Sequence, residues 1–257
     1  MLFRYLLYWL RAGNEHSIHS PFVFELYREV IRPKSATYYS FAEIELLRTK
    51  MLTNREIIDV LDLGAGSRKH ASNQRSIQQI ARHSLKPTEI GQLLFRLVNR
   101  FKPEVIFDLG TSLGITTLYL ATAQRKSQFL TFEGCPAIGK IALQNFERMG
   151  CHHIQLVEGN LDETLKRKAS EVDRIDFAFF DANHRYQSTI DYFEICLSKA
   201  HEQSVFVFDD IHWSEDMEKA WQQIQSHPRV MISIDLFDVG LIFFRTNQPK
   251  QHFVLRR

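Results

Sequence analysis

Cysteine is scarce in this chain of 257 residues, and its three thiols, Cys135, Cys151 and Cys196, form no C-x-x-C pair. The sequence therefore lacks the cysteine framework of a small secreted domain. We expect buried thiols in a reducing compartment, the cytoplasm. The run Cys151-His152-His153 contains metal-binding residue types, but it has no distant partner pair, which disfavours a zinc site.

An excess of charge of either sign is also missing. Lys and Arg number 32 against 30 Asp and Glu, which gives a formal net charge of +2. Nucleic-acid binding needs clustered basic residues, so this balance predicts no nucleic-acid partner. With 44% hydrophobic and 24% charged residues, the chain should bury a full core.

A hydrophobic run long enough to cross a bilayer is absent as well. The N-terminal stretch, residues 1–13, MLFRYLLYWLRAG, is apolar enough to need checking as a targeting segment, but Arg4 interrupts it. It is too short for a membrane span and no cleavage site follows it. Apolar side chains recur at the spacing of an amphipathic helix, at Leu2, Tyr5, Leu6 and Trp9. The few basic residues favour docking on the domain or on a second subunit, as in a homodimer, and leave a membrane surface as the alternative.

Glycine is sparse, but two glycines bracket a turn in the stretch VIFDLGTSLGITTLYLA, Val105–Ala121. Its apolar start, Val105-Ile106-Phe107, is typical of a strand buried on both faces. Gly110 and Gly114 then predict a tight turn, and the spacing after them predicts a helix. Such a turn exposes backbone N–H groups and lets a polar cofactor approach closely. The alternative is an ordinary turn of an α/β protein.

A second predicted strand, Phe129–Phe132, ends in Glu133. In nucleotide-binding α/β folds an acidic residue about 20 residues after the glycine turn hydrogen-bonds the ribose hydroxyls. The turn itself has the spacing D-x-G-x-x-x-G, which differs from the G-x-G-x-x-G motif of dinucleotide enzymes.

In these residues the chain resembles the class I S-adenosylmethionine (SAM) methyltransferases, and within them the catechol and caffeoyl-CoA O-methyltransferases. Asp108, Gly110, Gly114 and Thr116 match the spacing of that family's first motif. The resemblance implies SAM as cofactor. The residues that it places around SAM are Asp108, Gly110, Thr111, Ser112, Gly114, Thr116, Glu133, Gly134, Asn160, Asp162 and Asp181. For Asp162, capping of a helix is the alternative role.

An earlier stretch, Asp62–Ser67 (DLGAGS), also matches the first SAM motif. No strand ending in an acid follows it at the required distance, where Pro87 stands instead. Helices are predicted for 75–83 and 88–99. We therefore interpret Gly64–His70 as a loop of the N-terminal cap, a lid near the cofactor, with a duplicated motif as the alternative.

Strands and helices continue to alternate downstream. The pattern predicts strands at 153–157, 175–180 and 205–208, then a hairpin of 230–236 and 241–244 and a peripheral tail from 247. With the resemblance, this predicts an α/β fold: a Rossmann-like, seven-stranded, mostly parallel sheet with an antiparallel last strand, helices on both faces and an N-terminal helical cap. We expect the cap and lid loop over 1–95 and the SAM-binding core over 96–257.

Acidic residues follow four of the predicted strands, and so many acids in one crevice repel each other without a compensating cation. The resemblance gives Asp181 and Asp209 the positions of metal ligands in metal-dependent O-methyltransferases, which bind Mg²⁺ or a similar cation. Asp210 stands where that family has Asn, and His184 stands where it has a Lys base. The pattern D-x-x-H-x-Y, Asp181–Tyr186, is also common in a wider group of SAM methyltransferases that need not use metal.

We therefore predict methyl transfer from SAM to a small-molecule acceptor, most simply an oxygen, with catalytic Asp181 and His184 and with a metal at Asp181, Asp209 and Asp210. Because His titrates near neutral pH, His184 can take the acceptor's proton. His212 and Trp213 either flank the acceptor or begin a helix. Rival functions are a non-catalytic SAM-binding module and a nicotinamide-dependent oxidoreductase.

Overall fold

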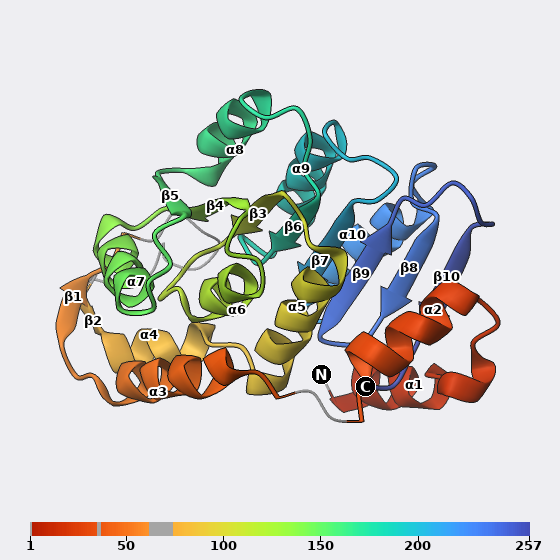
Figure 1. Cartoon of the computed structure of the whole chain (residues 1–257), viewed down its shortest axis with the longest axis horizontal. Coiled ribbons are helices and arrows are strands. Elements are labelled where there is room, and N and C mark those ends of the chain that lie inside the picture. Colours follow the sequence, from red (N-terminus) through yellow and green to blue (C-terminus); the bar gives the residue numbers. More distant parts are fainter. Residues whose placement is uncertain (1, 35–36, 62–73) are drawn as a thin grey trace. The chain divides into compact units, whose positions relative to one another are not determined.

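The computed structural model describes residues 2–34, 37–61 and 74–257 (Figure 1). The chain separates into two compact units, Met1–Ser35 with Lys168–Arg257, and Ala36–Arg167. The predicted division at residue 95 stays a prediction. No helix among the described residues combines the length and apolar character needed to cross a membrane.

Three parallel strands form the centre of the unit Ala36–Arg167: β3 (Val105–Leu109), β4 (Gln128–Glu133) and β5 (Ile154–Glu158). Phe107 aligns with Leu130, and Glu133 aligns with Glu158. These strands are the apolar runs that the sequence predicts. Figure 1 shows α6 and α7 on one side of them and α8 on the other. The helices of this unit are α3 (Tyr39–Thr53), α4 (Ile77–Ser84), α5 (Thr88–Phe101), α6 (Ile115–Ala123), α7 (Pro136–Arg148) and α8 (Leu161–Ser170).

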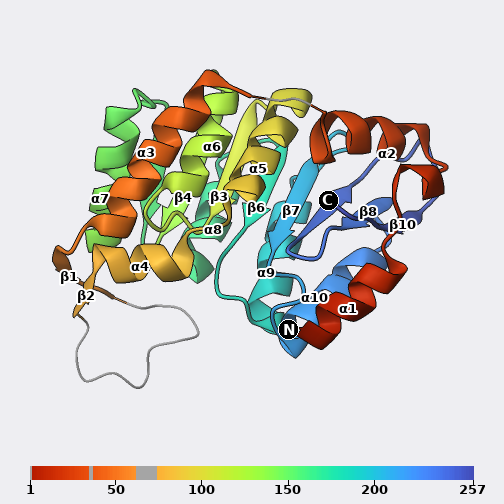
Figure 2. The same ribbon diagram turned by 90° about the horizontal axis from the view of Figure 1, so that it is seen from below.

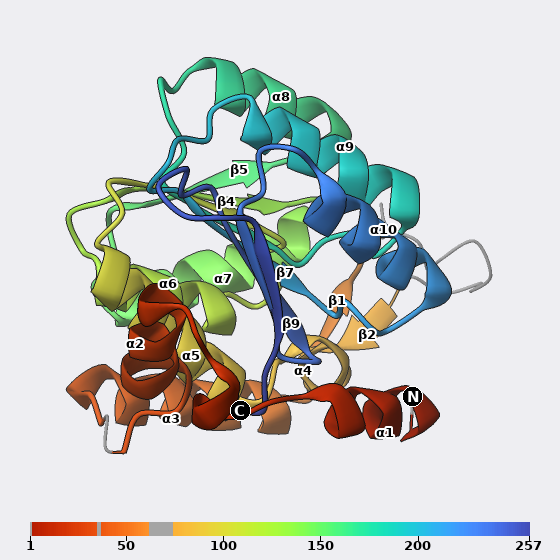
Figure 3. The ribbon, with the colours of Figure 1, turned by 90° about the vertical axis from the view of Figure 1, so that its right-hand side faces the viewer.

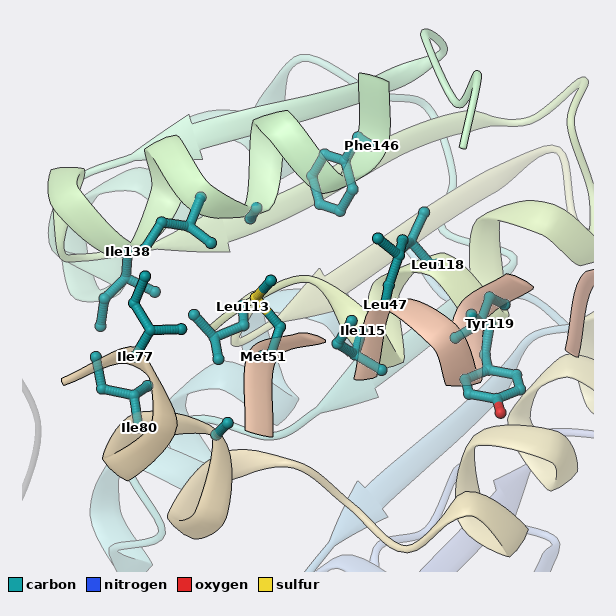
Figure 4. Packing of buried hydrophobic residues seen from close by; sticks show 14 of the residues in the cluster. Leu47, Met51, Ile77, Ile80, Leu113, Ile115, Leu118, Tyr119, Ile138 and Phe146 are labelled. Carbon is teal, nitrogen blue, oxygen red and sulfur yellow. The ribbon is translucent and has the colours of Figure 1, made fainter. Parts of the chain in front are cut away.

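The core of this unit lies where α3, α4, α6 and α7 bring their apolar faces together (Figure 4). Leu47 and Met51 of α3 pack there with Leu113 and Leu118, all nearly without solvent exposure. Burial at about 25 cal/mol per Å² of apolar surface makes this cluster a main stabilising contribution. Figure 2 shows α3 beside α6. The core therefore packs against the turn between β3 and α6 through Leu113 and supports it.

The stretch before the earlier glycine motif forms a short strand, β1 (Ile57–Asp59), that pairs antiparallel with β2 (Gln74–Ser76). Ser76 and Gln79 form a capping box that begins α4. β1 thus differs from the buried parallel strand that a SAM motif follows. The motif residues 62–67 and the predicted lid 64–70 lie outside the described residues.

The second unit has five strands among its described residues, in the order β10-β8-β9-β7-β6. β6 (Phe177–Phe180) and β7 (Val205–Asp209) are parallel, and Phe180 aligns with Phe208. β8 (Ile232–Asp235) and β9 (Val239–Phe243) form the predicted hairpin, with β9 antiparallel to β7. α9 (Tyr186–Leu197) and α10 (Glu215–Ser226) cover one face of these strands, and α2 (Pro21–Leu26) covers the other (Figure 3).

The N-terminal residues are helical, with one helix that begins at Pro21 and a helical turn that ends before Pro33. The elements are α1 (Leu2–Arg11), the 3-10 turn η1 (Glu15–Ser17), α2 (Pro21–Leu26) and the π-helical turn η2 (Tyr27–Ile31). Ser20 caps α2 by accepting a hydrogen bond from the Val23 backbone N–H.

The tail is not peripheral, contrary to the sequence-based expectation. Residues Gln251–Val254 form β10, which pairs parallel with β8, and Leu255 is buried. Gly13 bridges to Leu255, so the segment after α1 lies against the chain's last residues (Figure 3). The predicted α/β fold with a mostly parallel sheet is confirmed, and β10 adds a strand to it.

Candidate active site

The turn after β3 has the tight geometry that its glycines predict. Gly110 and Gly114 have φ of +118° and +78°, and the Gly114 N–H donates to the Thr111 carbonyl at 2.9 Å. A Cβ on Gly114 would lie 2.5 Å from a ring carbon of Phe146, so only glycine fits. Gly114 is also the N-cap residue of α6 and makes no side-chain hydrogen bond there. The backbone N–H groups at a helix N-terminus are suited to binding a negatively charged group of a ligand.

Glu133 joins this turn to the end of β4. Its carboxylate accepts the Ser112 N–H at 2.8 Å on one oxygen and the Cys135 N–H at 2.9 Å on the other. Burial raises the pKa of Glu133, and the backbone N–H groups of Cys135, Ser112 and Gly134 oppose that rise. The predicted ribose-binding acid is thus held at the glycine turn by fixed hydrogen bonds.

Asp108 lies beneath the turn rather than in it. It is fully buried, and one carboxylate oxygen accepts from Thr117 Oγ1 at 2.7 Å and Thr131 Oγ1 at 2.8 Å. The hydroxyl that reaches Asp108 therefore belongs to Thr117, next to the Thr116 of the sequence motif. Thr131 was missed because its strand position gives no sequence signal for such a contact.

Ser112 has a second partner that the sequence does not indicate. It adopts φ of +47°, rare for a residue other than glycine, and donates its hydroxyl to Ser84 Oγ at 2.8 Å. Ser84 ends α4, so a helix from before β3 contributes to the turn. Thr111 is held too, since its N–H donates to the Phe132 carbonyl at 3.0 Å.

The turn after β5 contains Asn160 and Asp162. The Asn160 side chain accepts the Asp162 N–H at 3.1 Å at the start of α8, so Asn160 caps this helix and Asp162 stands in its first turn. The Gly159 N–H donates to the Glu133 carbonyl at 3.0 Å. This turn therefore lies beside the end of β4 and the glycine turn.

The other unit brings together Asp181, His184 and Asp209. One ligand atom of each lies within 4.8 Å of the others, and His184 Nε2 is 3.4 Å from Asp181 Oδ1. The register of β6 and β7 explains the pairing, since Asp181 and Asp209 end neighbouring parallel strands. Asp209 is 2% exposed, while Asp181 and His184 are partly accessible. Two carboxylates and an imidazole are a donor set that suits a divalent cation.

A strained loop holds His184 in this group. Asn183 and His184 have φ of +67° and +40°. The Asn183 amide donates to Ser188 Oγ at 2.9 Å and Tyr192 Oη at 3.3 Å, both on α9. Asn183 was not singled out in the sequence, although its position next to His184 could have suggested it.

Asp210 does not belong to the three-residue group. It also has a positive φ, +54°, and its N–H donates to the Asp238 carbonyl at 2.7 Å. Among the residues that the structure describes, Asp181, His184 and Asp209 form the one cluster of three such ligands. His184 therefore takes the place that the sequence prediction gave to Asp210.

His212 lies in a separate network. Its Nε2 is 2.8 Å from Asp235 and its Nδ1 is 3.2 Å from Glu218, which also pairs with Arg4 at 3.1 Å. Burial alone would lower the pKa of His212, but the hydrogen bonds and charges of Asp235 and Glu218 outweigh it and raise the pKa. His212 thus anchors α1 and α10, whereas Trp213 is exposed.

Comparison with known proteins agrees with this geometry. Residues 107–211 match a family model described as a methyltransferase domain. A search of curated proteins finds no match. Several solved structures share the fold. One is an O-methyltransferase from Bacillus cereus in complex with SAH, with 20% identity and a TM-score of 0.57, and the match covers 86% of this chain and 96% of that one. A SAH-bound methyltransferase from Podospora anserina covers 83% of this chain and 100% of its own, at 16% identity and TM-score 0.56.

A third structure is the O-methyltransferase TomG from Streptomyces achromogenes, solved with SAM (18% identity, TM-score 0.55, 63% of this chain and 82% of that one). The family match spans β3 to the residues after β7, which hold both groups of residues described above. The fold and this match together identify residues 107–211 as a methyltransferase domain.

Proposed function

We propose that the chain transfers a methyl group from SAM to the hydroxyl of a small molecule. The observation that carries this proposal is the glycine turn after β3, tied to the Glu133 carboxylate through the Ser112 N–H at 2.8 Å. The turn receives the amino-acid end of SAM, and Glu133 binds the ribose hydroxyls. SAM and SAH in the solved structures of similar fold support the cofactor, and an oxygen acceptor is supported because two of those proteins are O-methyltransferases.

Asp162 and Asn160 complete the nucleotide site in this proposal. They lie in the turn after β5, whose Gly159 is bonded to Glu133. Asn160 shapes the turn as a helix cap, and Asp162 receives the adenine amine. Gly110, Thr111, Ser112, Gly114, Thr116 and Gly134 line the site, and Asp108 holds it from beneath.

Methyl transfer needs an aligned acceptor that loses its proton, since the sulfonium already activates the methyl carbon. In our proposal His184 Nε2 accepts the hydroxyl proton, and Asp181 orients the ring and stabilises its charge. The loop strain at Asn183 and His184 fixes the imidazole before the acceptor arrives.

A divalent cation is a second proposal for the same side chains. Asp181, Asp209 and His184 would hold it, because their ligand atoms converge and Asp209 is buried. Such a cation lowers the pKa of a bound hydroxyl. Titrating the protein with Mn²⁺ by calorimetry and by electron paramagnetic resonance tests it. One saturable site that Asp209→Asn weakens supports the cation, and no saturable site contradicts it.

The methyl-transfer proposal is tested by product formation. The protein with SAM and a panel of hydroxylated aromatic acceptors should release SAH, and thermal shift should respond to SAM and SAH but not to NAD⁺. Stabilisation by NAD⁺ alone would favour an oxidoreductase. SAM binding without SAH release from any acceptor would favour a non-catalytic module.

His184→Ala separates the roles of the histidine. We expect it to slow turnover by about 10² or more, since a general base contributes 10²–10⁴-fold, while SAM affinity changes less than about threefold. Asn183→Ala is the matched variant, because it removes the side-chain hydrogen bonds from Asn183 to Ser188 and Tyr192 but leaves the imidazole of His184. Equal loss of SAM affinity and turnover in His184→Ala would show a structural role instead.

A further inference from the structure

The first helix, α1, has apolar side chains on two opposite sides, and only one of these sides packs against the rest of the chain. Tyr8 and Ala12 are buried, and Tyr5 and Tyr8 contact the Phe237 ring with centroids 4.9 and 5.2 Å away. The Tyr8 hydroxyl donates to the Leu255 carbonyl. These contacts, with the Arg4–Glu218 ion pair, dock α1 beside α10 (Figure 2).

The opposite side of α1 carries large apolar side chains in solvent, which we call the outer face. Its exposed fractions are Leu10 65%, Leu6 52%, Trp9 46% and Leu7 38%, and Tyr5, at the border with the docked side, is 46% exposed. Five exposed large apolar side chains lie together on one ten-residue helix, and clustered exposed apolar side chains mark interaction sites on soluble proteins. A helix that merely covered its own domain would turn polar residues outward.

The charged residues of α1 itself are all basic, Arg4 and Arg11. Residues 1–14 contain no Asp or Glu, and Arg11 is exposed beside Leu10. Arg256 lies over the Trp9 ring at 4.3 Å and donates to the Trp9 carbonyl at 3.0 Å. Two acids close to the docked side of α1 are paired, Glu218 with Arg4 and Asp238 with Arg257. The outer face is therefore an apolar strip with arginine at its edges.

We propose that the outer face of α1 binds the surface of a membrane that contains anionic phospholipids. The leucines enter the boundary between headgroups and acyl chains, Trp9 and Tyr5 lie at the headgroup level, and Arg11 and Arg256 meet lipid phosphates. The helix lies on the membrane and does not cross it. This inference is independent of the proposed methyl transfer.

A second copy of the chain is the competing occupant, and two observations disfavour it. A symmetric dimer brings a patch against itself, so the arginines would meet an arginine-edged surface without an acid to pair with. One ten-residue helix also offers a small contact, whereas a stable interface buries roughly 800 Å² per partner. Anionic lipid complements the charge and needs no larger area.

The test uses the full chain with two kinds of vesicle. Phosphatidylcholine vesicles containing phosphatidylglycerol should carry the protein upward in a flotation gradient, and pure phosphatidylcholine vesicles should carry much less. The double substitution L6S/L10S should reduce the bound fraction by about tenfold or more, and R11E should reduce it on anionic vesicles alone.

Leu46→Ser is the matched control, since Leu46 is a 59% exposed leucine on α3. It should bind vesicles like the wild type, and circular dichroism should show all variants folded. The proposal is overturned if the wild type does not float with anionic vesicles, or if L6S/L10S floats as well as Leu46→Ser. A dimer in sedimentation analysis that L6S/L10S dissociates would assign the face to self-association instead.

Discussion

Gly114 shows how a single position decides whether the turn after β3 can form. Its φ is +78°, and an added Cβ would come within 2.5 Å of the Phe146 ring. We predict that Gly114→Ala lowers the free energy of unfolding by about 2–4 kcal/mol, because left-handed strain and steric overlap add. SAM affinity should fall as well, since the start of α6 must shift.

Gly150→Ala is the matched control for this substitution. Gly150 also has a positive φ, +60°, but a Cβ there would have no heavy atom within 4 Å. It should cost only about 1–2 kcal/mol in chemical denaturation. Equal destabilisation by the two substitutions would show that the contact with Phe146 does not matter.

The glycine turn and Glu133 could be predicted from the sequence because their signals are local. Glycines at fixed spacing between a strand and a helix, and an acid at a strand end, do not depend on distant residues. The partners of Asp108 could not be predicted, since Thr131 reaches it only through the pairing of β3 with β4. His184 could be identified from its spacing to Asp181. That His184, and not Asp210, joins Asp181 and Asp209 in the group of possible metal ligands depends on loop geometry, which the sequence does not show.

The docking of α1 through His212 makes the protein's stability depend on pH. The pKa of His212 is raised in the folded chain, where Asp235 and Glu218 favour its charged form over the opposing effect of burial. A raised pKa stabilises the fold fully below the unfolded value, and this contribution is lost as pH rises through the folded pKa. We therefore predict that the unfolding free energy falls as pH rises above the ordinary histidine pKa of about 6.5.

His212→Gln should flatten this dependence. Denaturant unfolding of wild type and variant below and above that pKa measures the difference, which should be largest at the acidic end, about 1–3 kcal/mol where charged hydrogen bonds are lost. His201→Gln is a suitable control, because His201 pairs with Asp176 away from α1. A constant difference at every pH would refute the linkage.

The last strand shows the limit of reading short elements from sequence. Gln251–Val254 has only four residues and alternating polarity, so its pattern does not distinguish it from a loop. β10 pairs parallel with β8 although β9 lies between them in the sequence, so this contact is non-local. The first helix was easier to predict, because its helical spacing lies within the segment itself.

Substitution of Leu255 tests how much the C-terminal tail contributes to the free energy of unfolding. It is 2% exposed, and the backbone around it receives the hydroxyls of Tyr8 and Tyr27. We predict that Leu255→Ala destabilises the fold by about 2–4 kcal/mol through the cavity that it leaves. Leu143→Ala, at an exposed leucine of α7, should cost much less in the same thermal or denaturant assay. Similar losses would mean that the tail is peripheral after all.

The whole chain carries two groups of functional side chains, one in each compact unit. The glycine turn and Glu133 belong to Ala36–Arg167, and Asp181, His184 and Asp209 belong to the other unit. In our proposal the first group binds the methyl donor and the second prepares the acceptor. A methyltransferase needs both, so loss of either should abolish turnover, while only the first should control SAM affinity.

Calorimetry with SAH tests the central claim most directly, because it measures cofactor binding without any acceptor. The wild type should bind one SAH per chain, and Glu133→Ala should weaken binding by about tenfold or more, the value of a lost charged hydrogen bond. Glu158→Ala, at the aligned position at the end of β5, should bind like the wild type. Absence of heat with the wild type, or unchanged affinity in Glu133→Ala, would contradict the account.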